Sequence, residues 1–200
     1  MKGPLTNVNS AECMAEFCRI MKFPRECAEQ ISEIVEFREV EDGAVLISPG
    51  EVSYNIYFIL SGFGVGYCVT DMGDSKCLYL QTSSYVLCSL ATLAHGEVSE
   101  YCCCMQRGGL VAVVDDRKLM SMAMKDMMIC RWYVGVLKSA LVRFEKKAAN
   151  FITKDSRHRL QELYDESPEI FSNALGKQIA SFIGVTPVHL SRILSSKVHR

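Results

Sequence analysis

A long run of helical periodicity between residues 127 and 152 constrains the fold more than any other part of this chain. Its apolar residues recur in mixed steps of three and four, which is typical of a two-stranded helical seam. The run makes about seven turns, and a helix of that length needs an extended partner surface. We therefore predict a dimerisation helix over residues 127–153; packing on its own domain alone is the alternative. The residues expected at the interface are Trp132, Val136, Leu137, Ala140, Leu141 and Phe144.

The segment before this helix, residues 38–114, has a strand-like pattern. Short apolar runs at 44–47, 56–60, 64–69, 77–80, 101–105 and 110–114 are separated by Gly, Pro, Asp and Ser. Many short strands with turn residues at regular intervals predict a compact antiparallel barrel or roll. Residues 90–96 form an expected short helix or turn within it, and a second short helix is expected over 116–126.

Helical spacing also precedes the strands. Residues 10–23 predict an amphipathic helix capped by Ser10, with Ala11, Met14, Ala15, Cys18 and Met21 facing inward. A second helical piece is expected from Pro24 to Phe37, with Cys27, Ile31, Ile34 and Val35 inward.

The C-terminal segment predicts a helix-turn-helix. After a helix over 155–166 that Asp155 can cap, two short helical patterns flank Gly184. Thr186 can cap the second helix, and Pro187 suits its first turn. The apolar face holds Ile179, Ala180, Ile183, Val185, Leu190, Ile193 and Leu194, whereas His189, Ser191, Arg192 and Ser195 are left outside. A helix pair with a basic, polar outer face can enter a major groove; a helical hairpin that only packs is the alternative.

Charge is distributed unevenly. The net charge of −1 excludes a wholly basic coat, yet residues 10–42 hold nine acids against four bases, and no acid follows Glu169. This polarity fits contact with DNA at one end of the chain. The sequence shows no signal peptide and no run of about 18 apolar residues. We therefore expect no membrane partner, a cytoplasmic location, and ten cysteines present as reduced thiols.

Four motifs in a fixed order carry a family resemblance. They are Asp42-Gly43 with Ser48-Pro49-Gly50-Glu51, then Tyr57 to Gly62, then Asp155 to Leu160, and finally Thr186 to Arg192. Over residues 30–196 the chain resembles the Crp/Fnr family, the bacterial regulators that include the cyclic-AMP receptor protein and the fumarate-nitrate regulator.

The resemblance implies an α+β fold in three parts. A cyclic-nucleotide-binding-like β-roll of the jelly-roll type, with the N-terminal helices, occupies residues 1–126. The long dimerisation helix follows at 127–153, and a helix-turn-helix DNA-binding domain at 154–200. It also implies a homodimer that binds promoter half-sites in double-stranded DNA, with RNA polymerase as a further candidate partner.

The resemblance also places the expected DNA contacts. These are Lys177, Thr186, Pro187, Val188, His189, Ser191, Arg192 and Ser195. Arg192 falls where the family has a base- or phosphate-contacting arginine, whose fork suits a guanine edge. Val188 stands where the family often has glutamate, so the recognised sequence should differ. The sequence ends at Arg200, where the family usually continues into a β-hairpin wing; either the protein lacks a wing or the sequence is shortened.

The family's ligand residues are replaced. Its Gly-Glu-Leu segment corresponds to Cys88-Ser89-Leu90, and its phosphate-binding Arg-Ser pair corresponds to Ser99-Glu100. Without the arginine, and with an acid in place of the serine, a bound phosphate would lose a charge-assisted hydrogen bond and be repelled. We therefore expect an unknown small-molecule effector other than cyclic AMP, and no cofactor. The expected pocket is lined by Cys88, Ser89, Leu90, Ser99, Glu100, Tyr101 and Phe144.

Other function classes have weaker signals. Cys102, Cys103 and Cys104 alternate across a predicted strand and cannot all bind one metal, and Cys13, Cys18 and Cys27 fit no iron–sulfur spacing. No nucleophile elbow, paired acid site or phosphate loop predicts an enzyme, and no metal site is expected. The alternatives are a cysteine-based redox or metallocofactor sensor, and a protein-interaction module with a vestigial helix-turn-helix.

Overall fold

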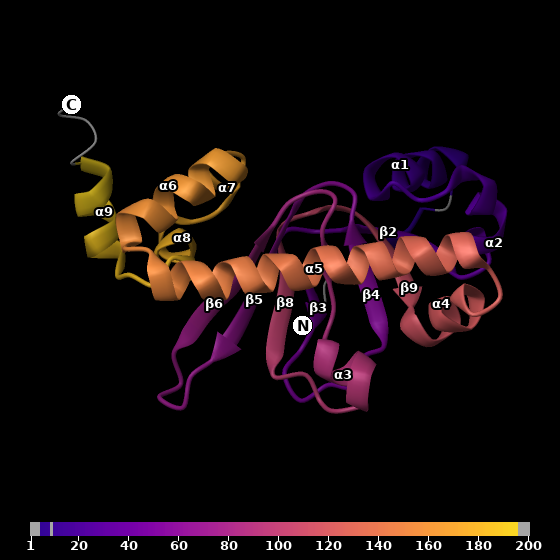
Figure 1. Cartoon of the computed structure of the whole chain (residues 1–200), viewed down its shortest axis with the longest axis horizontal. Helices are drawn as coiled ribbons and strands as arrows, with labels where there is room; N and C mark the ends of the chain where they lie inside the picture. Colours follow the sequence, from indigo (N-terminus) through magenta and orange to yellow (C-terminus); the bar gives the residue numbers. More distant parts are fainter. Residues whose placement is uncertain (1–4, 9, 196–200) are drawn as a thin grey trace.

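The computed structural model describes residues 5–8 and 10–195. Helix α5, Met127–Thr153, runs along the molecule in front of a β-roll, with helices gathered at both of its ends (Figure 1). The N-terminal end carries α1 (Ala11–Met21), η1 (Arg25–Cys27), α2 (Ala28–Ser32) and α4 (Asp116–Ala123). The C-terminal end carries α6 (Ser156–Glu166), α7 (Ile170–Asn173), α8 (Gly176–Phe182) and α9 (Pro187–Ser195). No helix in the described ranges is long and apolar enough to cross a membrane.

The roll consists of two antiparallel sheets. The first has the order β1 (Leu5–Asn7), β2 (Val35–Val40), β9 (Gly109–Asp115), β4 (Asn55–Ile59) and β7 (Val86–Leu87). The second has the order β3 (Val45–Ile47), β8 (Tyr101–Arg107), β5 (Phe63–Val69) and β6 (Ser75–Gln81). Leu46, Ile59, Met105 and Val111 belong to a buried core formed by residues from both sheets, and α3 (Leu90–His95) follows β7. The α+β roll and all six predicted strand runs are confirmed.

The prediction of a helix up to Phe37 was wrong. Helix α2 ends at Ser32, and strand β2 begins at Val35. Val35, Phe37 and Val40 are buried and the acids between them are exposed, an alternation that only a strand produces. Pairing with β9 along the whole of β2 satisfies the backbone here, and it overrides a helical pattern too short to decide the structure.

The first helix has the expected bounds but a different buried face. Ser10 caps α1, accepting a hydrogen bond from the Cys13 backbone N at 3.2 Å. Phe17 is fully buried, whereas Ala11 and Ala15, expected inward, are exposed. The Phe17 ring packs edge-on against Phe58 of β4, so the large aromatic side chain sets the orientation of the helix.

The same N-terminal core includes the start of α5. The Trp132 ring packs against Phe17, Phe23 and Phe58, and its Nε1 donates a hydrogen bond to the Met21 carbonyl at 2.9 Å. Val136 packs against this cluster as well. Both residues were expected at the subunit interface; within the chain they are half-buried and pack against this N-terminal core.

The C-terminal helices pack directly on the second sheet. Phe63, Val65, Cys77 and Leu80 of the roll share one hydrophobic cluster with residues of α6 to α9. Gln178 of α8 is 2% exposed and donates from Nε2 to Tyr67 Oη and to Gln106 Oε1. The Cys77 backbone N donates to Ser181 Oγ at 2.8 Å. The helix-turn-helix is therefore docked on the roll through apolar contacts and satisfied polar ones.

Candidate functional site

The turn between α8 and α9 has the geometry that a helix-turn-helix requires. Gly184 adopts φ +76°, and a Cβ there would lie 2.6 Å from the Phe151 ring, so both the backbone angle and the packing require glycine. Thr186 Oγ1 accepts a hydrogen bond from the His189 backbone N at 3.2 Å. This is the predicted cap, and it fixes the start of α9 at Pro187.

Helix α9 has one buried face and one exposed face. Leu190 and Ile193 are buried, and Leu194, expected on the same face, is 44% exposed. The eight residues expected to contact DNA are all exposed: Lys177, Thr186, Pro187, Val188, His189, Ser191, Arg192 and Ser195. Within the described part of the chain, Arg192 has no hydrogen-bond or ion-pair partner. The exposed face can therefore offer an unpaired guanidinium to a ligand.

The outer face of α5 carries exposed apolar side chains in helical register. Leu137 and Leu141, both expected at the interface, are exposed, and Leu141 is 67% exposed. Val134, Val142 and Ile152 extend this stripe. Ala140 and Phe144 were also expected there, but they line a cavity on the inner side of the helix. The Phe144 ring packs edge-on against Tyr79 of the roll, with ring centroids 5.5 Å apart.

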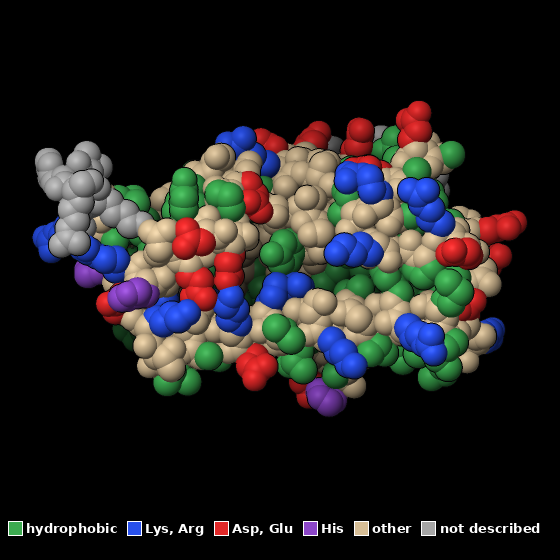
Figure 2. All heavy atoms as spheres, turned by 45° about the horizontal axis from the view of Figure 1, so that its top comes forward, with side chains coloured by type: hydrophobic (Ala, Val, Ile, Leu, Met, Phe, Trp, Pro, Cys, Tyr) green, Lys and Arg blue, Asp and Glu red, His purple; other side chains and the backbone are tan. Residues whose placement is uncertain are grey.

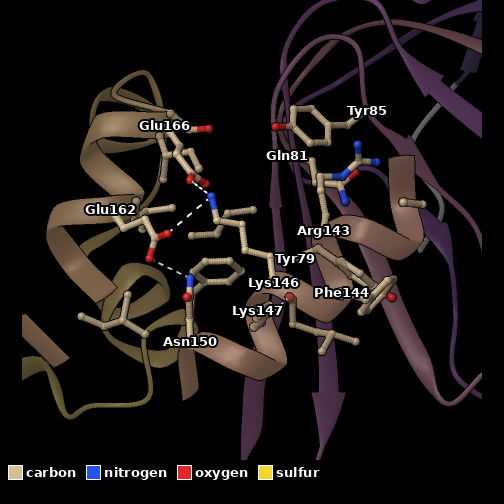
Figure 3. Close-up of a pocket in the computed structure, with 18 of the residues that line it drawn as sticks. Tyr79, Gln81, Tyr85, Arg143, Phe144, Lys146, Lys147, Asn150, Glu162 and Glu166 are labelled. Atoms are coloured by element: carbon tan, nitrogen blue, oxygen red, sulfur yellow. Dashed lines mark hydrogen bonds and ion pairs between the residues drawn. The ribbon is translucent and has the colours of Figure 1, made fainter. Parts of the chain in front are cut away.

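The cavity holds about 190 Å³ and lies between three parts of the chain. The roll contributes β6, β7 and the turn between them, α5 contributes its inner face, and the C-terminal helices contribute residues of α6 and α8 (Figure 3). Tyr79 forms part of its wall. The Tyr79 ring also packs on Gly66, where a Cβ would lie 2.2 Å from Tyr79 Cδ2, so a larger residue at position 66 would displace the ring.

Only three of the seven residues expected around the effector line this cavity: Cys88, Leu90 and Phe144. Ser89 is buried as the cap of α3, accepting from the Thr92 backbone N. Ser99 is 1% exposed and its Oγ donates to the Tyr101 carbonyl. Glu100 is exposed, and Tyr101 packs against the core of the roll. These four residues therefore lie outside this cavity, and the hydroxyls of Ser89 and Ser99 form hydrogen bonds within their own segments.

Acids at one side of the cavity are already paired. Lys146 Nζ forms ion pairs with Glu166 and, at 3.4 Å, with Glu162. Asn150 Nδ2 and Lys154 Nζ each donate to Glu162 Oε2 at 2.7 Å. These contacts lower the pKa of Glu162, first through the hydrogen bond from Lys154. The carboxylates of α6, Glu162 and Glu166, are thus paired with lysines of α5 and of its C-terminal cap.

Three cations that line the cavity have no acidic partner in the described part of the chain: Arg143, Lys147 and Arg159, and Arg159 donates to the Ile183 and Lys154 carbonyls. The Arg143 guanidinium lies over the Tyr85 ring at 4.6 Å, and burial lowers the pKa of Arg143. Lys147 Nζ lies 4.0 Å from the Phe182 ring centroid and donates to the Leu78 carbonyl at 2.7 Å. Burial lowers the pKa of Lys147 to about 8.

These cations give the lining of the cavity positive charge that no acid in the described chain pairs with. Figure 2 shows a hollow along this face, with hydrophobic side chains at its floor and both basic and acidic side chains at its edges. Neither Arg143 nor Lys147 was singled out from the sequence. The signal that could have identified them is their position: they fall at helical spacing with Ala140, Phe144 and Phe151.

The thiols offer little support for redox chemistry. Burial raises the pKa of seven of the ten, including Cys77 and Cys88 to about 12 and Cys104 to about 11. Thiolates are the reactive form, so burial disfavours reaction of these seven side chains at neutral pH. In the described residues, no group of three or more His, Cys, Asp and Glu is placed to hold a metal ion.

Solved structures share this architecture. FixK2 from Bradyrhizobium japonicum matches with a TM-score of 0.70 over 83% of this chain and 85% of its own, at 16% identity. A CooA mutant from Carboxydothermus hydrogenoformans matches with 0.70 over 98% and 87%, also at 16% identity. A Crp/Fnr-family protein from Eubacterium rectale matches with 0.68 over 92% and 88%, at 12% identity. No family model and no curated protein matches the sequence itself. The chain has the fold of the Crp/Fnr regulators.

Proposed function

We propose that the chain is a sequence-specific DNA-binding transcription regulator rather than an enzyme. The carrying observation is the exposed face of α9, which combines an unpaired Arg192 with short polar side chains at the end of a correctly capped helix-turn-helix. Because a fold alone does not establish function, the proposal depends on this face. Arginine reads a guanine edge bidentately, and the hydroxyls of Thr186 and Ser191 suit phosphate oxygens.

The proposal includes a homodimer formed through α5. Val134, Leu137 and Leu141 of the exposed stripe follow one another in steps of three and four residues, as in a two-stranded seam. Exposed apolar stripes of this kind mark association surfaces. A twofold axis along α5 would present two α9 helices to the two half-sites of a promoter.

The effector in this proposal is a small molecule other than cyclic AMP. Ser99 and Glu100 replace the family's arginine and serine, and neither residue lines the cavity. The cavity touches the roll, α5 and the DNA-binding helices together. A ligand that binds two arrangements of these parts unequally would shift their populations and so change DNA affinity.

The test begins with selection of bound sequences from random duplex DNA. Fluorescence anisotropy then compares the wild type with Arg192→Ala on the selected site, with Arg131→Ala, an exposed arginine of α5, as the matched control. Arg192→Ala should weaken specific binding by about 1–3 kcal/mol, and the control should not. Equal binding by both variants would show that Arg192 does not contact DNA, and no selected site would refute the proposal.

A further inference from the structure

The cavity between the roll, α5 and the DNA-binding helices has a polar end whose groups are not satisfied within the described chain. Figure 3 shows Arg143, Gln81 and Tyr85 together, on the opposite side of the hollow from Glu162 and Glu166. Gln81 is 9% exposed, and its Oε1 has no hydrogen-bond partner. A buried acceptor without a partner is costly; this oxygen needs a hydrogen-bond donor, so it would not itself bind an anion.

Charge at this end is also uncompensated. The Arg143 guanidinium has five N–H donors, and its one described contact is the Tyr85 ring. Lys147 lies one turn further along the same face of α5, where residues four apart are neighbours. The two acids of the cavity are held by Lys146, Lys154 and Asn150, so they do not neutralise Arg143 or Lys147.

The remaining walls are aromatic and aliphatic. Tyr79 and Phe144 pack edge to face, and Leu78, Leu80 and Leu87 surround them. A dry cavity of about 150 Å³ accommodates a benzene ring, so about 190 Å³ has room for one ring and a small substituent. The space, the rings and the two cations of α5, which have no acidic partner in the described chain, therefore suit different parts of one ligand.

We infer that this cavity binds a small organic acid, whose carboxylate is held by Arg143 and Lys147 and whose apolar body lies against Tyr79 and Phe144. The cations come from α5 and not from the roll segment around Ser99. The ring of Phe182 in α8 lies against the Lys147 ammonium. An acid bound to Lys147 would therefore bind at the contact between α5 and the C-terminal helices. Its role as the effector rests on the proposed function, but its binding does not.

The experiment uses three probes of equal size and different charge: benzoate, benzamide and benzylamine. Isothermal titration of the full chain without DNA measures each dissociation constant at pH 7. Charge-assisted hydrogen bonds should make benzoate bind at least about tenfold more tightly than benzamide, and benzylamine should not bind. Arg143→Gln should remove this preference, whereas Arg131→Gln, an exposed arginine of the same helix, should retain it.

Several results would overturn the inference. Equal binding of benzoate and benzamide would show that the cavity does not select an anion. Benzoate binding unchanged by Arg143→Gln would place the acid elsewhere, and the absence of binding by all three probes in the folded wild type would exclude a single-ring acid. Because no DNA is present, failure of DNA binding in the anisotropy assay would refute the proposed function and leave these outcomes unaffected.

Discussion

Replacing Lys147 by methionine should stabilise the folded chain at neutral pH. Burial lowers the pKa of Lys147 from 10.5 to about 8, which corresponds to roughly 3 kcal/mol of lost stability when the lysine is charged in both states. Methionine removes this cost. It also leaves the Leu78 carbonyl without its donor and removes the ring contact with Phe182, each worth about 1 kcal/mol. We expect a net stabilisation of about 1 kcal/mol at pH 7.

The pH dependence has a definite sign. Between pH 8 and 10.5 the unfolded chain keeps the Lys147 proton that the folded chain has released, so the stability of the wild type rises with pH in this window. The advantage of Lys147→Met should therefore shrink by about 1 kcal/mol between pH 7 and pH 9. The variant and wild type must be compared directly, because buried thiols with raised pKa values also titrate in both proteins at high pH.

Urea unfolding at fixed protein concentration, followed by circular dichroism at both pH values, measures this difference. Lys138→Met, at an exposed lysine of α5, is the matched control and should change stability by less than about 0.5 kcal/mol. A destabilised Lys147→Met that does not respond to pH would show that the ammonium is solvated in the folded chain. It would also weaken the case for Lys147 as a ligand of the acid.

Three further predictions concern other parts of the structure. In the proposed dimer both subunits would bury Leu141, so Leu141→Glu should raise the dimer dissociation constant about a hundredfold or more. Sedimentation equilibrium measures this constant, and Val69→Glu is an exposed control. Gln178→Ala should weaken the docking of α8 on the roll by about 1–3 kcal/mol, and hydrogen exchange should then accelerate in α8 and β6; unchanged exchange would show that Gln178 is dispensable there. Burial raises the pKa of Cys88 and of Cys103, so both should resist iodoacetamide at pH 8 until the chain unfolds. Mass spectrometry detects the label, and rapid labelling of the native chain would support the redox hypothesis instead.

Local patterns determined much of this fold. The strand runs, the cap at Ser10, the bounds of α5 and the Gly184 turn depend on residues close together in sequence, so they could be predicted from it. The strand at Val35–Val40 could not, because its partner β9 lies more than 60 residues further along the chain. A short apolar pattern fits a helix or a strand until such a partner is known.

The faces of α5 show the same limit. The sequence shows that α5 has a broad apolar stripe. It does not show which apolar residues pack inside the chain and which remain on the surface. Trp132 and Val136 complete the N-terminal core, Ala140 and Phe144 line the cavity, and Leu137 and Leu141 remain exposed. The division follows from the position of the roll against the helix, which is set by contacts such as the Trp132 hydrogen bond to Met21.

The expected effector residues and the cavity overlap only in part, and the difference bears on the functional proposal. The resemblance assigns a ligand to the segment of the roll where relatives keep an arginine, yet here that position is Ser99, buried and hydrogen-bonded within its own loop. Cations without an acidic partner lie instead at the cavity, with Arg143 and Lys147 on α5 and Arg159 on α6. An anion held by the roll would act on α5 only through intervening contacts. An anion held by α5 itself acts on the helix that would form the dimer, and through Lys147 and Phe182 on α8. Ligand binding and DNA binding would then be coupled by one rigid element, and each must change the affinity for the other by the same factor.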